Sequence, residues 1–462
     1  MSTALAEAKQ RLASKLDHAD PSGLEPSSAD PWIITSLLQK AIRRGEAEIA
    51  KRAANTLFAL KGSAIWRRYM IIAFEDVGVG SIDAIVAAVA ASSDADFRKQ
   101  CGGGARVAIA LAGLLAEAAK DRSADHLVSA WDHPSMSTIW QAMAGTSAET
   151  RLSNVFDSDL PVTVRAMATR SLCGLSPGQR LPTLRSQLTS LLTAFSDKGV
   201  PDELIAATEI AALRTREPIT VMIPLLWLLA NNGQVLSIED CPVPSSPIVR
   251  DIPLYALDMH TRLGGEAIRR LMRENDAVRS CLEQYVPQKR WREAAYVAAF
   301  HVDAAPIRRR LIWDQSWQVE QFGVERDLAF GGVKPEGVEP LMEAVRNNLD
   351  HLNLLRSEAL LRSSVSSPQS KSLKGIEGGI GLLPDGSLNI WVPGTPPSRW
   401  FKARSQTGKP VYIRIDYNVD GQPKYPVELA KFQIEAEDKE MCAKEPTEWI
   451  RNGVYWQRKS AD

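Results

Sequence analysis

The chain has 462 residues, of which 45% are hydrophobic and 24% are charged, and this composition is that of a soluble globular protein. Its 55 Lys and Arg residues balance its 55 Asp and Glu residues, which argues against a protein dedicated to electrostatic nucleic-acid binding but still allows a local basic face. The length predicts about three domains.

Nothing in the sequence indicates a secreted, membrane or metal-binding protein. Residues 1–20 lack the apolar core of a signal peptide, and the apolar run 222–230 is too short to span a membrane. The five cysteines form no CxxC pair, and no two of the six histidines have the spacing of a helical zinc site. The sequence therefore predicts a cytoplasmic protein with reduced thiols, no metal, no cofactor and no membrane contact.

Helical periodicity governs most of the chain. Asp30 and Pro31 are typical of a helix start, and Gly45 is typical of a helix end. Apolar residues at helical spacing predict early helices at 32–44, 46–60, 63–75, 81–92 and 104–120. Shorter helices follow to residue 231 and resume after residue 252, with long ones expected at 304–323 and 336–363.

The last ninety or so residues differ in character, because a Ser-rich segment leads into short apolar runs that alternate with Asp-Gly turns. The predicted fold is mainly α, a multi-helix bundle or irregular α-solenoid with a small C-terminal α+β appendage whose helix is expected at 426–439. The predicted parts are an N-terminal helix and linker (1–31), a helical module (32–145), its helical continuation (146–231), a Pro-rich crossover (232–252), a second helical module (253–363), a Ser-rich linker (364–375) and a small β-containing domain (376–462).

Four charged residues, Arg67, Arg68, Glu75 and Asp76, interrupt an otherwise apolar helical pattern between residues 37 and 83. A buried guanidinium is costly unless carboxylates or carbonyls satisfy its donors, so we expect an ion-pair cluster that clamps neighbouring helices. A catalytic role for Glu75 or Asp76 is the alternative.

With Ala73 and Gly78, these residues follow a pattern that resembles the C-terminal helical region of replication-associated recombination ATPases, the bacterial relatives of Werner-helicase-interacting proteins. The resemblance covers residues 32–120 and departs from the family pattern at Phe74 and Val77. It implies a helical module used for oligomer contacts. The sequence has no GxxxxGK[ST] motif, and the glycine cluster at 101–106 lacks the lysine that would hold phosphates, so we expect no ATPase activity.

A second group of residues is basic and aromatic. Arginines contact phosphates and tryptophans stack on unpaired bases, so a face of this composition would suit single-stranded nucleic acid. The alternative is that the tryptophans are core anchors and the arginines pair with Asp303, Asp314 and Glu320. The group comprises Lys289, Arg290, Trp291, Arg292, Arg308, Arg309, Arg310, Trp313 and Trp317.

A third group, Asp258, His260 and Glu266, places a histidine among carboxylates, as in acid–base catalysis. Asp258 and Arg262 are also four residues apart, as in an ordinary helix-stabilising pair.

Three hypotheses follow for the function. The first is a non-enzymatic interaction or scaffold protein associated with DNA replication, recombination or repair, whose partners would be proteins, through self-association or a separate ATPase. The second is a single-stranded nucleic-acid-binding protein that uses the basic and aromatic group. The third is an enzyme of unknown reaction with a site near residues 258–266.

Overall fold

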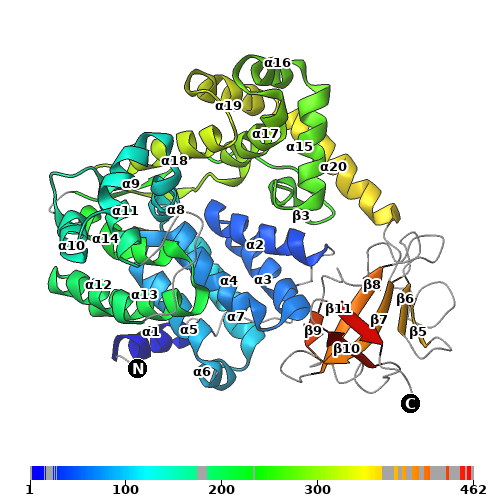
Figure 1. Cartoon of the computed structure of the whole chain (residues 1–462), viewed down its shortest axis with the longest axis horizontal. Helices are drawn as coiled ribbons and strands as arrows, with labels where there is room; N and C mark the ends of the chain where they lie inside the picture. The colour runs from blue at the N-terminus through cyan, green and yellow to red at the C-terminus, as the bar shows by residue number, and fades with distance from the viewer. Residues whose placement is uncertain are drawn as a thin grey trace. The chain divides into compact units, whose positions relative to one another are not determined.

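The computed structural model describes residues 3–14, 16, 24, 27, 29–173, 185–232 and 235–366, and after them only the strands between residues 379 and 458. The chain forms two compact units, Met1–Ser363 and Ser364–Asp462 (Figure 1).

The described residues before 367 contain twenty α-helices, so the prediction of a mainly α fold is confirmed. In chain order they are α1 (Thr3–Ser14), α2 (Pro31–Arg44), α3 (Ala47–Lys61), α4 (Ala64–Ile72), α5 (Ile82–Ser93), α6 (Ala95–Gln100), α7 (Gly104–Glu117), α8 (Ser123–Val128), α9 (Ser137–Ala144), α10 (Ala148–Phe156), α11 (Val162–Leu172), α12 (Arg185–Asp197), α13 (Asp202–Thr215), α14 (Met222–Ala230), α15 (Arg262–Glu274), α16 (Asp276–Tyr285), α17 (Trp291–Ala299), α18 (Ser316–Phe330), α19 (Val338–Asn347) and α20 (Leu349–Ser366).

Two π-helical turns extend helices of this unit. The turn η3 (Ala73–Val77) follows α4, and the turn η10 (Phe300–Ala304) follows α17. A π turn inserts a residue into the helical path, changes the direction in which the following side chains point, and occurs frequently at functional sites. Both turns contribute side chains to the site described below.

Four short strands lie among the helices, and one of them contradicts the prediction. The helix expected over 304–323 is wrong in its first part, because Arg309–Ile312 forms strand β4, which pairs antiparallel with β1 (Ser237–Asp240). The backbone hydrogen bonds of β4 are formed with residues more than sixty positions away in the chain, so pairing between distant segments outweighs the local helical pattern. Strands β2 (Ile248–Val249) and β3 (Ile252–Pro253) form a second small antiparallel pair.

The helix expected over 336–363 is divided into α19 and α20. The division falls at Asn348, whose backbone N–H donates to Val345 O at 3.1 Å and whose side chain donates to Ala344 O at 2.8 Å. A side chain that caps the preceding helix in this way ends it.

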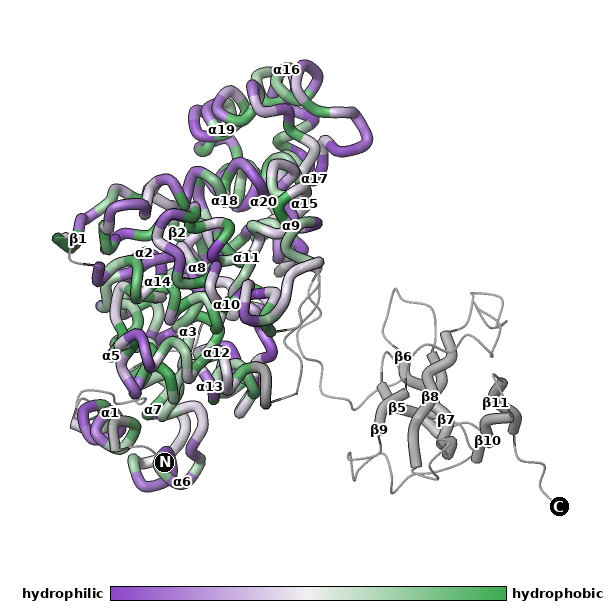
Figure 2. Tube along the Cα trace, turned by 60° about the vertical axis from the view of Figure 1, so that its left-hand side comes forward, coloured by the Kyte–Doolittle hydropathy of each residue, from purple (hydrophilic) through white to green (hydrophobic). Residues whose placement is uncertain are grey.

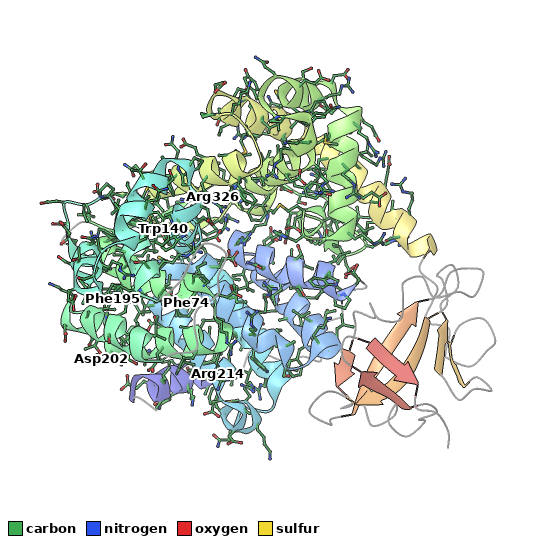
Figure 3. All side chains as sticks on the ribbon, viewed as in Figure 1. Phe74, Trp140, Phe195, Asp202, Arg214 and Arg326 are labelled. Carbon is green, nitrogen blue, oxygen red and sulfur yellow. The ribbon has the colours of Figure 1, made fainter. Side chains whose placement is uncertain are left out.

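The helical unit contains two hydrophobic cores. The larger core is built mainly from α1 to α14 and includes the fully buried Phe74 and Phe195 (Figure 3). The smaller core is built from α15 to α20 around residues such as Leu328 and Leu341. Figure 2 shows apolar and polar residues alternating along the helices, which is the amphipathic pattern of helices that each bury one face. The site lies where helices of the two cores meet.

The described part of the second unit consists of strands in one sheet. Strand β7 (Ser398–Arg404) pairs antiparallel with β8 (Pro410–Asp416) along its length and with β6 (Leu388–Trp391) at its start, and parallel with β10 (Glu448–Asn452) at its end. The sheet is completed by β5 (Gly379–Leu382), β9 (Gln433–Glu435) and β11 (Tyr455–Arg458). Strand β9 therefore replaces part of the helix expected over 426–439, and the rest of that range lies outside the described residues.

None of the described helices combines the length and the apolar content that crossing a bilayer requires.

Candidate functional site

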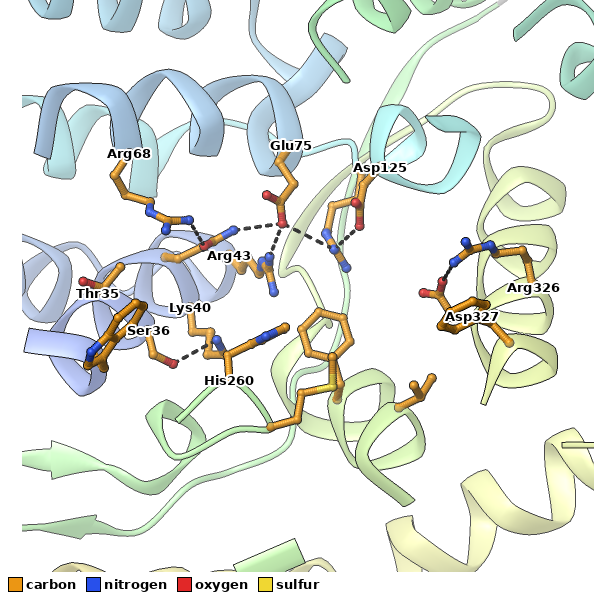
Figure 4. Close-up of a pocket in the computed structure, with 17 residues that line it drawn as sticks. Thr35, Ser36, Lys40, Arg43, Arg68, Glu75, Asp125, His260, Arg326 and Asp327 are labelled. Carbon is orange, nitrogen blue, oxygen red and sulfur yellow. Dashed lines mark hydrogen bonds and ion pairs between the residues drawn. The ribbon is translucent and has the colours of Figure 1, made fainter. Parts of the chain in front are cut away.

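A polar pocket of about 640 Å³ lies between the two cores of the helical unit (Figure 4). Its volume is in the range of small-molecule sites, about 300–1,000 Å³. Side chains of α2, α4, α8, α17 and α18, of both π turns and of the segment before α15 line it. In Figure 4, Thr35 and Ser36 lie on one side, and Arg326 and Asp327 lie on the opposite side.

One face of α2 forms a complete wall of the pocket. The helix is fixed at its start by the Asp30 carboxylate, which accepts hydrogen bonds from two backbone N–H groups at 2.8 and 3.1 Å, and at its end by Gly45 in the left-handed conformation. The lining residues recur every three or four positions, which places them in one stripe of the helix. They are Trp32, Thr35, Ser36, Gln39, Lys40 and Arg43.

The π turn η3 points two adjacent carboxylates into different surroundings. The Asp76 side chain is fully buried, with Arg43 Nε 2.5 Å and Gln39 Nε2 2.9 Å from its oxygens. The Glu75 side chain is 20% exposed and lines the pocket, where Arg43 Nη2 lies 2.7 Å and Gln39 Nε2 2.9 Å from its Oε1. Asp76 is therefore a structural counter-ion for Arg43, whereas Glu75 is accessible to a ligand.

Arg122 connects this cluster to α8. Its Nε lies 3.3 Å from Asp76 Oδ1, and its Nη2 donates to the Asp125 carboxylate. Burial and the carboxylates of Asp76 and Asp125 raise the pKa of Glu75 to about 7, although Arg43 and Arg122 act in the opposite direction. Burial likewise raises the pKa of Asp125. The raised pKa favours the protonated form of Glu75, which can donate as well as accept a hydrogen bond.

Lys40 and His260 lie on the side of the pocket opposite Glu75 (Figure 4). Lys40 Nζ lies 2.7 Å from Asp258 Oδ2 and donates to Ser36 Oγ at 3.0 Å. Burial lowers the pKa of Lys40, although the Asp258 carboxylate acts in the opposite direction. The His260 ring meets the Phe300 ring edge to face, at 5.8 Å between centroids. Desolvation lowers the pKa of His260, which favours the neutral imidazole.

Helix α18 supplies the opposite wall. Arg326 Nη1 donates to Asp327 Oδ1 at 2.7 Å, and His301 Nε2 lies 3.0 Å from Asp327 Oδ2. Burial tends to raise the pKa of Asp327, but the His301 and Arg326 contacts outweigh it and lower that pKa to about 2. Gly323, two turns before the end of α18, lets this helix approach His126, because a Cβ there would lie 2.1 Å from Nδ1 of His126.

The structure separates the four charged residues of the segment 37–83. Arg67 points away from the pocket and donates to Thr215 O and Glu217 Oε1 at 2.8 and 2.7 Å. Arg68 lines the pocket, and its Nη1 lies 3.5 Å from Gln39 Oε1. The arginines that pair with the two carboxylates are therefore Arg43 and Arg122, which come from other segments.

The nine residues of the basic and aromatic group do not all lie on helices. They are distributed over α17 and the turn before it, β4 and the residues on either side of it, and α18. Trp313 is buried and donates to Asp121 Oδ2 at 2.9 Å, while Trp291 is half-buried and donates to Val286 O at 3.0 Å. Trp317 is 49% exposed, and the Arg310 guanidinium lies 4.2 Å from its ring.

The cations of this group are largely engaged within the protein. Ion pairs join Arg310 to Glu320 at 2.6 Å and Arg292 to Glu293 at 2.8 Å. Backbone carbonyls accept hydrogen bonds from the Arg290 and Arg309 side chains. The bond from Arg308 to Arg43 O, at 3.1 Å, comes from the backbone N–H of Arg308 and not from its guanidinium. Lys289 lies in the turn Gln288–Arg290. None of the nine residues lines the pocket between the two cores.

Of the third group, only His260 lines this pocket. Asp258 is buried behind it with Lys40, and its Oδ1 accepts a hydrogen bond from the His260 N–H at 3.1 Å. Glu266 is turned away toward Arg362, 3.3 Å distant. Residues 258–266 therefore contribute one wall of a site that is completed from elsewhere.

Sequence reasoning missed most of the pocket residues, which include Trp32, Gln39, Lys40, Arg43, Arg122, Asp125 and Phe330. One signal was present, because Gln39, Lys40 and Arg43 occur at the helical spacing of a buried face in α2. In the part of the chain that the structure describes, no group of three or more His, Cys, Asp or Glu side chains is arranged to hold a metal ion. Comparison with protein-family models, curated proteins and solved structures finds no match.

Proposed function

We propose that the helical unit is a binding protein that recognises a small anionic ligand in the pocket between its two cores. Arg68 is the observation that carries the proposal. Its side chain lines the pocket, and no described carboxylate forms an ion pair with it. Phosphate and carboxylate groups match the donor geometry of a guanidinium, so a ligand with such a group would satisfy Arg68.

The other charges of the pocket are compatible with an anion. Arg43 and Arg326 are paired with Asp76 and Asp327. Their positive charges lie close to the proposed anion, but the direct contact with the anion is assigned to Arg68. The raised pKa of Glu75, about 7, reduces the negative charge that would oppose an anion at neutral pH.

Inorganic pyrophosphate is a suitable probe for titration calorimetry with the full chain. Arg68→Gln is the test variant, and Arg67→Gln is its matched control, since Arg67 is the adjacent residue and is engaged with Glu217 outside the pocket. We expect Arg68→Gln to weaken pyrophosphate binding by about 10- to 150-fold, because a hydrogen bond to a charged group contributes about 1.5–3 kcal/mol. Arg67→Gln is expected to bind like the wild type.

Two results would contradict the proposal. One is the absence of any pyrophosphate binding at millimolar concentration. The other is an equal loss of affinity in the Arg67→Gln and Arg68→Gln variants, since a general change in surface charge would then explain both.

An interaction or scaffold role in DNA replication, recombination or repair stays a prediction that depends on the sequence resemblance, and so do protein partners and self-association. Ligand binding and such a role are compatible, since a ligand held between two cores stabilises the arrangement of the helices to which it binds.

A further inference from the structure

We infer that the ligand is a nucleoside phosphate, whose base stacks on Trp32 while its phosphate pairs with Arg68; this inference rests on the proposed function. Trp32 lines the pocket, yet 70% of its surface is exposed, which is unusual for a tryptophan. In the described part of the chain, neither another ring nor a cation contacts its indole. Its flat face is therefore available to a planar ligand.

Trp32 and Gln39, the residue beside Arg68, are spaced along α2 by about the length of a nucleotide. Exposure decreases along the lining stripe, from Trp32 at the solvent side to Gln39, Lys40 and Arg43, which are all buried. Gln39, whose carbonyl oxygen lies 3.5 Å from Arg68 Nη1, is seven residues after Trp32, which corresponds to about 10 Å along the helix. This separation is comparable with that between the phosphate and the far side of the base in a nucleotide.

Phe330 completes the solvent side of the pocket but is a weaker candidate for stacking. It is 66% exposed and lines the pocket from α18. The guanidinium groups of Arg326 and Arg290 already lie 5.2 and 5.6 Å from its ring centroid. We therefore assign the base to Trp32 and expect Phe330 to limit the width of the opening.

The chemistry requires a phosphate beside a base, which a free mononucleotide and the 5′-terminal nucleotide of a single strand both provide. The test measures the affinity of the full chain for adenosine 5′-monophosphate, ribose 5-phosphate and a 5′-phosphorylated oligodeoxythymidylate by titration calorimetry. Trp32→Ala is the test variant, and Trp317→Ala is its matched control, because Trp317 is a similarly exposed tryptophan that does not line this pocket.

We expect the wild type to bind the mononucleotide more tightly than ribose 5-phosphate. Trp32→Ala should weaken mononucleotide binding by about 5- to 150-fold, the factor that corresponds to ~1–3 kcal/mol of stacking per base, and should leave ribose 5-phosphate binding unchanged. Trp317→Ala should change neither affinity. Tighter binding of the oligonucleotide than of the mononucleotide would identify a strand end as the source of the nucleotide, and the reverse would identify the free nucleotide.

Equal affinity for the mononucleotide and ribose 5-phosphate, together with no effect of Trp32→Ala, would overturn the nucleotide assignment and leave anion binding at Arg68 intact. Loss of both affinities in Arg68→Gln, with none in Arg67→Gln, would then still support the proposed function. Failure of all three ligands and of pyrophosphate to bind would overturn both.

Discussion

Asp303→Asn should destabilise the helical unit strongly, because this residue holds two buried cations from different helices. Asp303 lies in the π turn η10, and its Oδ2 is 2.5 Å from Nη1 of Arg356. Neither side chain has any exposed surface. Arg44, at the end of α2, donates to the Asp303 carbonyl oxygen at 3.1 Å and lies 3.7 Å from Oδ1. Asp303 thus joins α2 of the larger core to α20.

The magnitude follows from the burial of Arg356. Besides its ion pair with Asp303, Arg356 donates a hydrogen bond to one other side chain in the described residues, to Asn353 Oδ1 at 2.9 Å. Removal of one partner from a buried ion pair leaves an uncompensated charge and costs about 3–5 kcal/mol. For a unit of 363 residues, an unfolding entropy of about 0.8 kcal/mol/K is expected, so the midpoint of thermal unfolding should fall by about 4–7 °C.

Thermal unfolding of the full chain, followed by far-ultraviolet circular dichroism, measures this loss, because all described α-helices precede residue 367. Asp276→Asn is the control, since Asp276 forms an exposed ion pair with Arg279 and its loss should change stability by no more than about 0.5 kcal/mol. The double variant Asp303→Asn with Arg356→Met should recover most of the lost stability, because no unpaired charge then stays buried. A midpoint for Asp303→Asn equal to that of Asp276→Asn would refute the reasoning.

Three other predictions concern stability. The pKa of Glu75 is about 7 in the folded state and 4.5 in the reference state, so its stabilising contribution is complete below pH 4.5 and is lost as the pH rises to 7. In urea unfolding at several pH values, the free energy of unfolding of Glu75→Gln should therefore rise relative to that of the wild type between pH 4.5 and 7. A difference between the two proteins that is constant over this range would contradict the prediction. Gly323→Ala should lower the free energy of unfolding by about 1–3 kcal/mol, because the new Cβ would clash with His126. Gly145→Ala should lower it far less, because a Cβ at that position meets no atom closer than 3.8 Å. Equal unfolding midpoints of the two variants would argue against close packing of Gly323 on His126. Burial lowers the pKa of Lys120 from 10.5 to about 7, so its contribution to the free energy of unfolding is present above pH 10.5 and is lost as the pH falls to 7. The free energy of unfolding of Lys120→Met should therefore rise relative to that of the wild type as the pH falls through this range. Parallel pH profiles of the two proteins in chemical unfolding would count against this assignment.

The mainly α fold could be predicted because its signals are local. Asp30, Pro31 and Gly45 define the ends of α2 from short-range chemistry alone, and the structure gives all three the expected roles. Strand β4 could not be predicted, because Arg309–Ile312 carries no feature that identifies its partner Ser237–Asp240. Pairing between distant segments depends on how the whole unit folds.

The pocket was less predictable than the fold. The sequence shows that Glu75 and Asp76 need cationic partners, but it cannot show that these are Arg43 and Arg122. Nor can it distinguish the pocket-lining Arg68 from the adjacent Arg67, because the way in which α4 packs against its neighbours decides which side each faces. A site made by five helices and two π turns exists only after they have assembled.

The strand β4 also holds the buried end of the α2 wall in place. The peptide groups beside it are bonded to the larger core, with Lys120 N donating to Arg309 O at 2.6 Å, Leu311 N to Lys120 O at 2.8 Å and Arg308 N to Arg43 O at 3.1 Å. Backbone hydrogen bonds therefore fix the segment around β4 next to Arg43, at the buried end of the α2 wall. Trp32 lies at the other end of that wall and is 70% exposed, so a ligand would reach the pocket from the Trp32 end.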